Sequence, residues 1–201
     1  MIRIDVRDNI AQIKRDLDRM RTDIAERAMA SAINRTADQG RTRMIREISR
    51  EFAISAGEVR GTLRLSRARP GFGTGKLIAE LAPLTKKRGR GFNLIRFVER
   101  KVSLAEGRRR AKAGTLRQIG FQIKRGSGTK RITGAFIGNK GRTVFVREGK
   151  ARLPIKAVTT IDVAQMFNTK RINGDVVAFI QQKFPEILTR EVRYFTERFG
   201  K

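Results

Sequence analysis

The chain has 201 residues, and its 46 Lys and Arg against 19 Asp and Glu give a formal net charge of +27 at pH 7. Self-repulsion of this size opposes compaction and indicates a polyanion or an acidic protein surface as partner, while an apolar fraction of 39% predicts that the chain folds. The absence of Cys and His excludes disulfides, thiolate or imidazole metal sites, cysteine nucleophiles and histidine acid–base chemistry.

The positive charge is concentrated in the middle of the chain. Residues 60–156 hold 27 basic and 4 acidic residues, a balance of +23, whereas residues 1–59 and 157–201 carry +2 each. No stretch reaches the roughly 18 apolar residues of a membrane span, and the first residues lack the apolar segment of a signal peptide. We therefore expect a protein that stays in cytosol-like solution, with its electrostatic character in the central region.

The N-terminal part is predicted to be helical. After a short strand at residues 2–6, apolar residues spaced by three and four predict a long helix over residues 9–50. Gly40 lies inside it and costs about 1 kcal/mol relative to Ala, so both a straight and a kinked helix stay open. Packing on the protein's own sheet is favoured over a coiled coil. The row of apolar residues along this helix includes three small ones that would let another element approach closely: Ala28, Ala30 and Ala32.

A second, short helix is predicted over residues 56–63. Ser55 and Glu58 have the spacing of a capping box, in which the two side chains satisfy free N–H groups at a helix start. A helix, a tight turn and a basic helix also occur in helix-turn-helix proteins, but no third helix supports a recognition helix here. A plain corner between two helices is the favoured interpretation.

The basic central region is predicted to be rich in strands. Residues 76–84, 92–98 and 116–124 are apolar runs typical of strands, and Pro83 favours an edge or strand end. The first loop between them contains Lys86, Lys87, Arg88 and Arg90. The second contains the densest basic cluster: Arg108, Arg109, Arg110 and Lys112. Phosphate contact through guanidinium groups and a solvated loop both stay open for this cluster.

Residues 134–155 predict a basic β-hairpin. Two runs of β-branched and aromatic residues, 135–137 and 144–146, flank a turn at residues 138–142 that is rich in Gly and Asn. The hairpin and the residues after it supply further candidates for contact with a partner: Lys140, Arg142, Arg147, Lys150 and Arg152.

The C-terminal part returns to helix. Residues 159–162 are typical of a cap before a short helix, and Asp175 is expected to cap a final amphipathic helix that Pro185 kinks or divides. The predicted fold is therefore α+β, with long N-terminal and C-terminal helices packed on a small, mostly antiparallel sheet with basic loops. We expect one domain, with helices over about 9–63, a basic β-rich region over about 76–156 and helices over about 160–199.

Three stretches in this order resemble a known family. They are Ala-Ile-Asn-Arg-Thr-Ala at 32–37 with Arg-Met-Ile-Arg-Glu-Ile at 43–48, the hairpin runs with the following Gly-Lys at 149–150, and Arg-Leu-Pro-Ile at 152–155 with Met-Phe at 166–167. Together they resemble the tail-completion family named after minor tail protein Z of lambda-like bacteriophages and prophages, over about residues 28–199. Two features depart from that pattern: the link at 156–162 lacks Gly and Pro, and the basic insert around residue 108 has no counterpart.

The resemblance implies a virion structural protein that finishes the tail and joins it to the head. It implies a homo-oligomeric ring, sixfold, with tail-terminator, tail-tube or head-closure proteins as neighbours. It further implies no enzymatic activity, no cofactor, and a place in the virion after assembly in the host cytoplasm. Contacts with neighbouring proteins are favoured over contacts with packaged DNA, because strong DNA binding in a channel would hinder ejection.

The residues also allow two other functions to be considered. A non-sequence-specific nucleic-acid-binding protein would suit the charge, but stacking on bases needs exposed aromatic rings, and most of the central rings lie in apolar strand patterns that favour burial. These are Phe72, Phe92, Phe97, Phe121, Phe136 and Phe145. A metal-dependent nuclease would need converging carboxylates, and residues 60–156 contain only Glu80, Glu99, Glu106 and Glu148.

Overall fold

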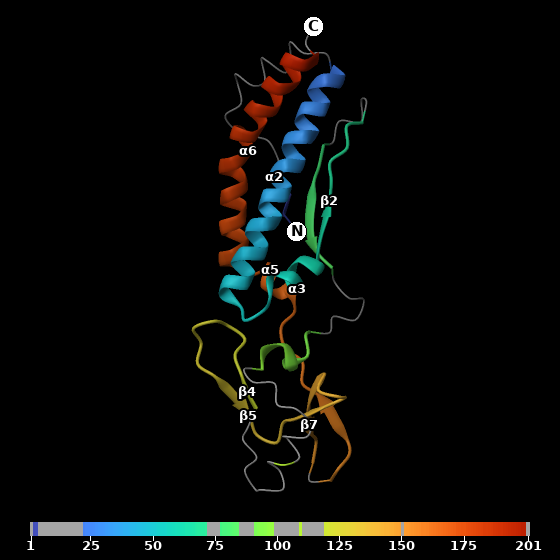
Figure 1. The fold of residues 1–201 in the computed structure, drawn as a ribbon, viewed down its shortest axis with the longest axis vertical. Coiled ribbons are helices and arrows are strands. Elements are labelled where there is room, and N and C mark those ends of the chain that lie inside the picture. The colour runs from blue at the N-terminus through green and yellow to red at the C-terminus, as the bar shows by residue number, and fades with distance from the viewer. Residues whose placement is uncertain are drawn as a thin grey trace.

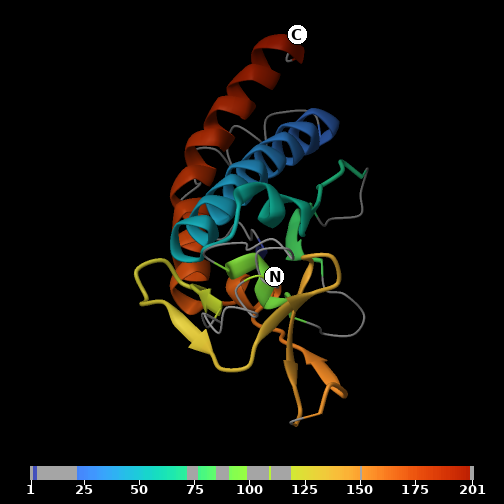
Figure 2. The same cartoon turned by 60° about the horizontal axis from the view of Figure 1, so that its bottom comes forward.

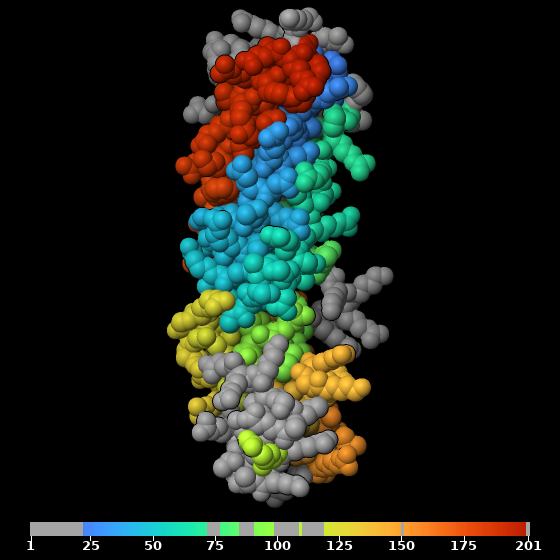
Figure 3. Space-filling view, in the orientation of Figure 1, coloured from blue at the N-terminus to red at the C-terminus, as the bar shows by residue number. Residues whose placement is uncertain are grey.

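The computed structural model describes residues 2–3, 22–71, 77–84, 91–98, 109, 119–149 and 151–199. Two 30-residue helices, α2 (Thr22–Glu51) and α6 (Lys170–Phe199), run antiparallel along one end of an elongated molecule (Figures 1 and 3). Small antiparallel sheets lie beside them and at the opposite end. The predicted α+β fold is confirmed, with three small sheets in place of one.

Small side chains on α2 let the two long helices pack closely. Ala28 and Ala32 are fully buried, and a Cβ added to Gly40 would lie only 2.8 Å from Cδ1 of Ile180 on α6. The backbone of α2 continues through Gly40 as one helix. The glycine is therefore used for close approach and not as a helix break. Residues 9–21, the first part of the predicted helix, lie outside the described residues.

The C-terminal helices confirm one predicted cap and correct another. Asp162 caps α5 (Val163–Phe167): it accepts the Gln165 N–H at 2.9 Å, while the Gln165 side chain accepts the Asp162 N–H. The prediction that Asp175 caps the last helix was wrong, because α6 begins at Lys170 and Asp175 lies inside it. Pro185 also lies inside α6 and does not divide it, although Figure 1 shows the helix changing direction part-way along.

The first sheet packs against α2. It has the order β1 (Ile2–Arg3), β3 (Glu80–Pro83) and β2 (Leu63–Ser66), all antiparallel. α3 (Ala56–Gly61) leads into β2 and is capped by Ser55, whose hydroxyl accepts the Glu58 N–H and donates to the Glu58 carboxylate. The predicted strand at 76–84 is shorter than expected, and Pro83 ends it as predicted.

The far end of the molecule carries the other two sheets. β4 (Ile119–Phe121) pairs with β5 (Lys130–Ile132), and β6 (Phe136–Gly138), β7 (Thr143–Arg147) and β8 (Ile155–Ala157) form the third sheet. The predicted hairpin at 134–155 is confirmed as the β6–β7 pair. Figure 2 shows the third sheet projecting from the body of the molecule.

The prediction of a strand over residues 92–98 was wrong. The chain forms the 3₁₀ helix η1 (Leu94–Phe97), because the side-chain oxygen of Asn93 accepts the Ile95 N–H at 3.1 Å and starts a tight turn. The same oxygen accepts the Val144 N–H at 2.9 Å, and the Asn93 amide donates to the Val144 carbonyl. Asn93 therefore fixes the third sheet to η1.

Backbone contacts join the far end to the helices. The N–H of Thr160 bonds to the Phe92 carbonyl at 2.8 Å, and the N–H of Ala53 after α2 bonds to the Ile123 carbonyl at 2.9 Å. Gly91 lies so close to the backbone of Thr160 that a Cβ added to Gly91 would stand 1.6 Å from the Thr160 carbonyl oxygen. Buried side chains from the long helices, η1, β4, β7 and α5 form one cluster, which continues from the helical end into the sheets.

Candidate assembly surface

The β6–β7–β8 sheet has one covered face and one open face. Its register places Ile137 beside Val144, which is fully buried, on the covered face. Neighbouring residues on a strand point to opposite faces, and directly paired residues share a face. Phe145 therefore lies with Phe136 and Ala157 on the other side, which we call the outer face. Arg147 and Ile155, which pair with each other, belong to the same face.

The outer face has an aromatic centre. The rings of Phe136 and Phe145 stack with centroids 5.9 Å apart, and the Arg147 guanidinium lies 5.2 Å from the centre of the Phe136 ring. A Cβ on Gly138 would stand 3.1 Å from the Phe145 ring, so the glycine gives this ring room to lie over the strand. Both rings are half-buried.

Two exposed aliphatic side chains lie in β8 and in the segment directly before it. Ile155 on β8 is 39% exposed and Leu153, two residues earlier, is 66% exposed. The Glu148 N–H bonds to the Pro154 carbonyl at 3.2 Å, which holds this segment against the end of β7. Sequence reasoning identified residues 153–155 only as the start of an extended stretch. An apolar run beside basic residues is the signal that could have indicated a surface patch.

Four of the predicted basic residues belong to the hairpin or to the segment before β8. Lys140 and Arg142 are exposed in the β6–β7 turn, where Asn139, Lys140 and Gly141 have φ of 49°, 52° and 84°. Arg147 and Arg152 are also exposed, and none of these four cations forms an ion pair with another residue in the described ranges. Residues 119–157 contain ten Lys and Arg but one acid, Glu148.

Only one of the remaining predicted contact residues lies among the described residues. Arg109 is described and exposed. The others lie outside the described residues: Lys86, Lys87, Arg88, Arg90, Arg108, Arg110, Lys112 and Lys150. Of the thirteen candidate residues, the structure therefore describes five, and four of these belong to the hairpin and the segment after it.

The Ala-Ile-Asn-Arg-Thr-Ala stretch at 32–37 is used for packing between elements. The Asn34 side chain donates to the Ala68 carbonyl and accepts the Ala68 N–H, both at 2.8 Å, and so ties the segment after β2 to α2. Arg35 lies 3.1 Å from Glu191, a carboxylate on α6 that is 3% exposed. Thr36 is fully buried and donates to the Ala32 carbonyl. The stretch holds α2, α6 and the first sheet together.

A network of charged residues joins the C-terminal part of α2 to the N-terminal part of α6. Arg43 on α2 donates to both Asp175 oxygens, at 3.0 and 3.3 Å, and this hydrogen bonding lowers the pKa of that carboxyl. Hydrogen bonds from Arg171, and then from Lys124, lower the pKa of Glu51. Sequence reasoning missed this network, because its partners come from distant parts of the chain.

Glu47 is the buried member of this network. Its carboxylate is fully buried and lies 3.4 Å from Arg43 and 2.6 Å from Arg50. The Arg50 guanidinium and the Glu47 carboxylate form an ion pair without a hydrogen bond. Replacing one partner of a buried ion pair leaves the other charge buried and uncompensated. The packing of α2 against α6 at this end therefore depends on all members of the charged network.

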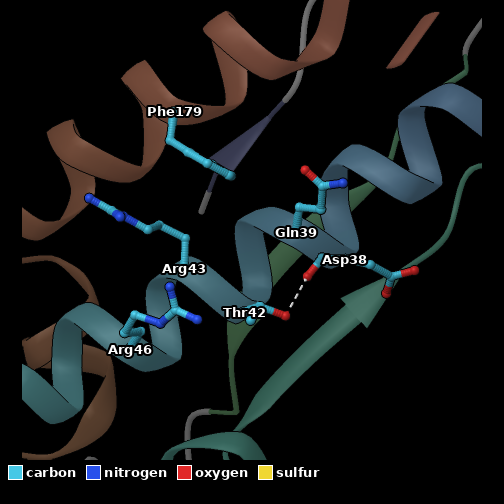
Figure 4. A pocket seen from close by; sticks show the side chains of 6 residues that line it. All are labelled: Asp38, Gln39, Thr42, Arg43, Arg46 and Phe179. Carbon is cyan, nitrogen blue, oxygen red and sulfur yellow. Dashed lines mark hydrogen bonds between the residues drawn. The ribbon is translucent and has the colours of Figure 1, made fainter. Parts of the chain in front are cut away.

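A shallow hollow of about 330 Å³ lies between α2 and α6 (Figure 4). Its lining includes Arg43, already bound to Asp175, and Phe179, over whose ring the same guanidinium lies at 5.7 Å. Thr42 donates to the Asp38 carbonyl within α2. In the part of the chain that the structure describes, no three His, Cys, Asp or Glu side chains gather where they could hold a metal ion. No described helix is long and apolar enough to cross a bilayer.

Comparison with known proteins identifies the family. The family model of prophage minor tail protein Z (GPZ) matches residues 10–199, nearly the whole chain. The chain belongs to this family. The resemblance found in the sequence is thereby confirmed, and the minor tail protein is a structural component of the phage tail, located in the virion and in contact with other tail or virion components. No curated protein and no solved structure matches the chain.

Proposed function

We propose that this minor tail protein completes the tail at the head–tail junction, where it forms a homo-oligomeric ring and joins neighbouring tail or head-closure proteins. The observation that supports this function best is the outer face of the β6–β7–β8 sheet, with its half-buried aromatic centre, its exposed aliphatic edge and its basic residues that form no ion pair within the described ranges. A joining protein needs a surface that remains open until it meets its neighbour, and an exposed patch of this composition is typical of interaction sites.

We further propose that the chain acts as one domain without catalytic activity, in the virion and, during assembly, in the host cytoplasm. The continuous cluster of buried side chains supports one domain. The sixfold ring follows from the family resemblance, and the long α2–α6 pair would supply flat sides for a head-to-tail contact between copies.

Non-sequence-specific DNA binding is the second candidate, favoured by the basic residues of the hairpin. The half-buried Phe136 and Phe145 rings stack on each other, and Arg147 lies over Phe136, so these rings offer less free surface to a base than an open stacking platform. Gel shifts with duplex DNA across a salt series test this candidate. Tight binding at physiological salt would favour it over protein contacts.

Electron microscopy of phage that lack this protein tests the leading function. We expect separate heads and tails, or joined particles that do not infect, and restoration by a plasmid copy of the gene. Normal yields of joined, infectious particles without the protein would contradict the proposal.

A further inference from the structure

We propose that the outer face of the β6–β7–β8 sheet binds a different virion protein through an apolar patch bordered by carboxylates, and that it does not bind a second copy of this chain. The inference deepens the proposed function by naming the binding face and the chemistry of its partner. It rests on the protein acting by assembly with virion neighbours.

The composition of the face defines the partner. Leu153 and Ile155 expose aliphatic surface that aqueous solvent disfavours, and burying such surface against a partner is favourable. Arg147 and Arg152 are both exposed beside this patch. An apolar centre with a cationic rim matches a patch of apolar side chains ringed by Asp or Glu. Aliphatic side chains do not stack on bases, so they favour a protein over a nucleic acid.

Charge excludes the same face of a second copy. A symmetric contact of this face with itself would bring Arg147 and Arg152 close to their own counterparts, and contact between like charges opposes binding. The partner surface must therefore be one on which carboxylates are available.

Among the described residues, most carboxylates elsewhere on the chain already contact cations of the same chain. On the long helices, Glu47 and Glu51 contact Arg43, Arg50, Lys124 and Arg171. Other acids are engaged in the same way by cations of this chain: Asp38 by Arg67, Glu58 by Arg96, Asp175 by Arg43, Glu186 by Lys183, Glu191 by Arg35 and Glu197 by Arg193. With a net charge of +27, a second copy is a poor source of an acidic surface, whereas a different and more acidic virion protein supplies one.

Incorporation into particles tests the face. Phage lacking the gene are complemented with Leu153→Glu or with Arg147→Glu, and purified particles are probed for the protein. Matched controls are Leu84→Glu and Arg64→Glu, which alter an exposed Leu (53% exposed) and an exposed Arg near the first sheet. We expect both outer-face variants to be incorporated at least tenfold less than the wild type and both controls to be incorporated normally. A tenfold loss corresponds to about 1.4 kcal/mol.

Circular dichroism and thermal unfolding establish that each variant is folded, and sedimentation compares its oligomeric state with that of the wild type. Normal incorporation of folded outer-face variants would overturn the inference. A loss of self-association by the outer-face variants would overturn it as well, because it would assign the face to a second copy.

A photo-reactive amino acid at position 153 identifies the partner directly in assembling phage. We expect a crosslink to another phage protein, at a peptide containing Asp or Glu, and none from the same amino acid at position 84. A crosslink to a second copy or to DNA would contradict the inference. If heads and tails join without the protein, the proposed function is refuted. The incorporation data would still show whether the outer face binds another virion protein.

Discussion

Replacing Gly40 by Ala tests the close packing of α2 against α6. The added Cβ would stand 2.8 Å from Cδ1 and 3.1 Å from Cγ1 of Ile180, distances at which the buried isoleucine must move. Ala favours a helix interior by about 1 kcal/mol over Gly, whereas overpacking a core costs about 1–3 kcal/mol. We therefore expect Gly40→Ala to change the free energy of unfolding by a net loss of about 0–2 kcal/mol.

Gly174→Ala is the matched control, because Gly174 also lies inside a long helix but a Cβ there meets no atom within 4 Å. This variant should stabilise the protein by about 0.5–1 kcal/mol. For a chain of this size, each kcal/mol shifts Tm by about 2–4 °C, so the two alanines should move Tm in opposite directions or differ by several degrees.

Urea denaturation followed by circular dichroism gives the free energies, and a second substitution identifies the cause. Ile180→Val removes the Cδ1 atom that Ala at position 40 would meet, so the double variant should lose less than the sum of the single losses. Equal stabilisation by Gly40→Ala and Gly174→Ala, with additive effects of Ile180→Val, would refute the argument that Gly40 is required for helix packing.

Three further predictions concern other contacts. The hydrogen bond from the Arg43 guanidinium lowers the pKa of Asp175. The stability that this carboxylate contributes is therefore present above the unfolded pKa of about 3.9 and is lost as the pH falls through the lower, folded pKa. Asp175→Asn should flatten the acid limb of a curve of unfolding free energy against pH, measured by urea denaturation. Asn34→Leu should cost about 1–3 kcal/mol by removing both partners of the Ala68 backbone groups, and retained stability in denaturation would contradict this. Gly91→Ala should prevent the native junction with Thr160 and lower Tm by several degrees or abolish folding, while an unchanged Tm would exclude the 1.6 Å approach.

Elements specified by neighbouring residues could be predicted from the sequence. The β6–β7 hairpin was found because its apolar runs and its Gly- and Asn-containing turn are local signals. The cap on α5 was found because Thr and Asp residues directly before an apolar run are a local signal for a helix start; the structure adds that Gln165 completes a capping box with Asp162. The small-residue stripe of α2 predicted close packing, although the sequence did not show that α6 is the partner.

Errors arose where distant residues decide the local structure. Asn93 initiates η1 and also bonds to Val144, which lies 51 residues away, so the apolar run around it did not become a strand. Asp175 was assigned as a cap because Asp is a common cap, but its partner Arg43 lies 132 residues away on another helix. The open face of the third sheet was missed for the same reason, since β8 joins the hairpin only in the folded chain.

The position of the protein in the intact virion tests the central claim most directly. A cryo-electron microscopy reconstruction of the head–tail junction is expected to show copies of this chain in a ring at the head-proximal end of the tail. The outer face of the β6–β7–β8 sheet should lie against a different protein. Density for the chain elsewhere in the tail, or an outer face open to solvent in every copy, would contradict the account.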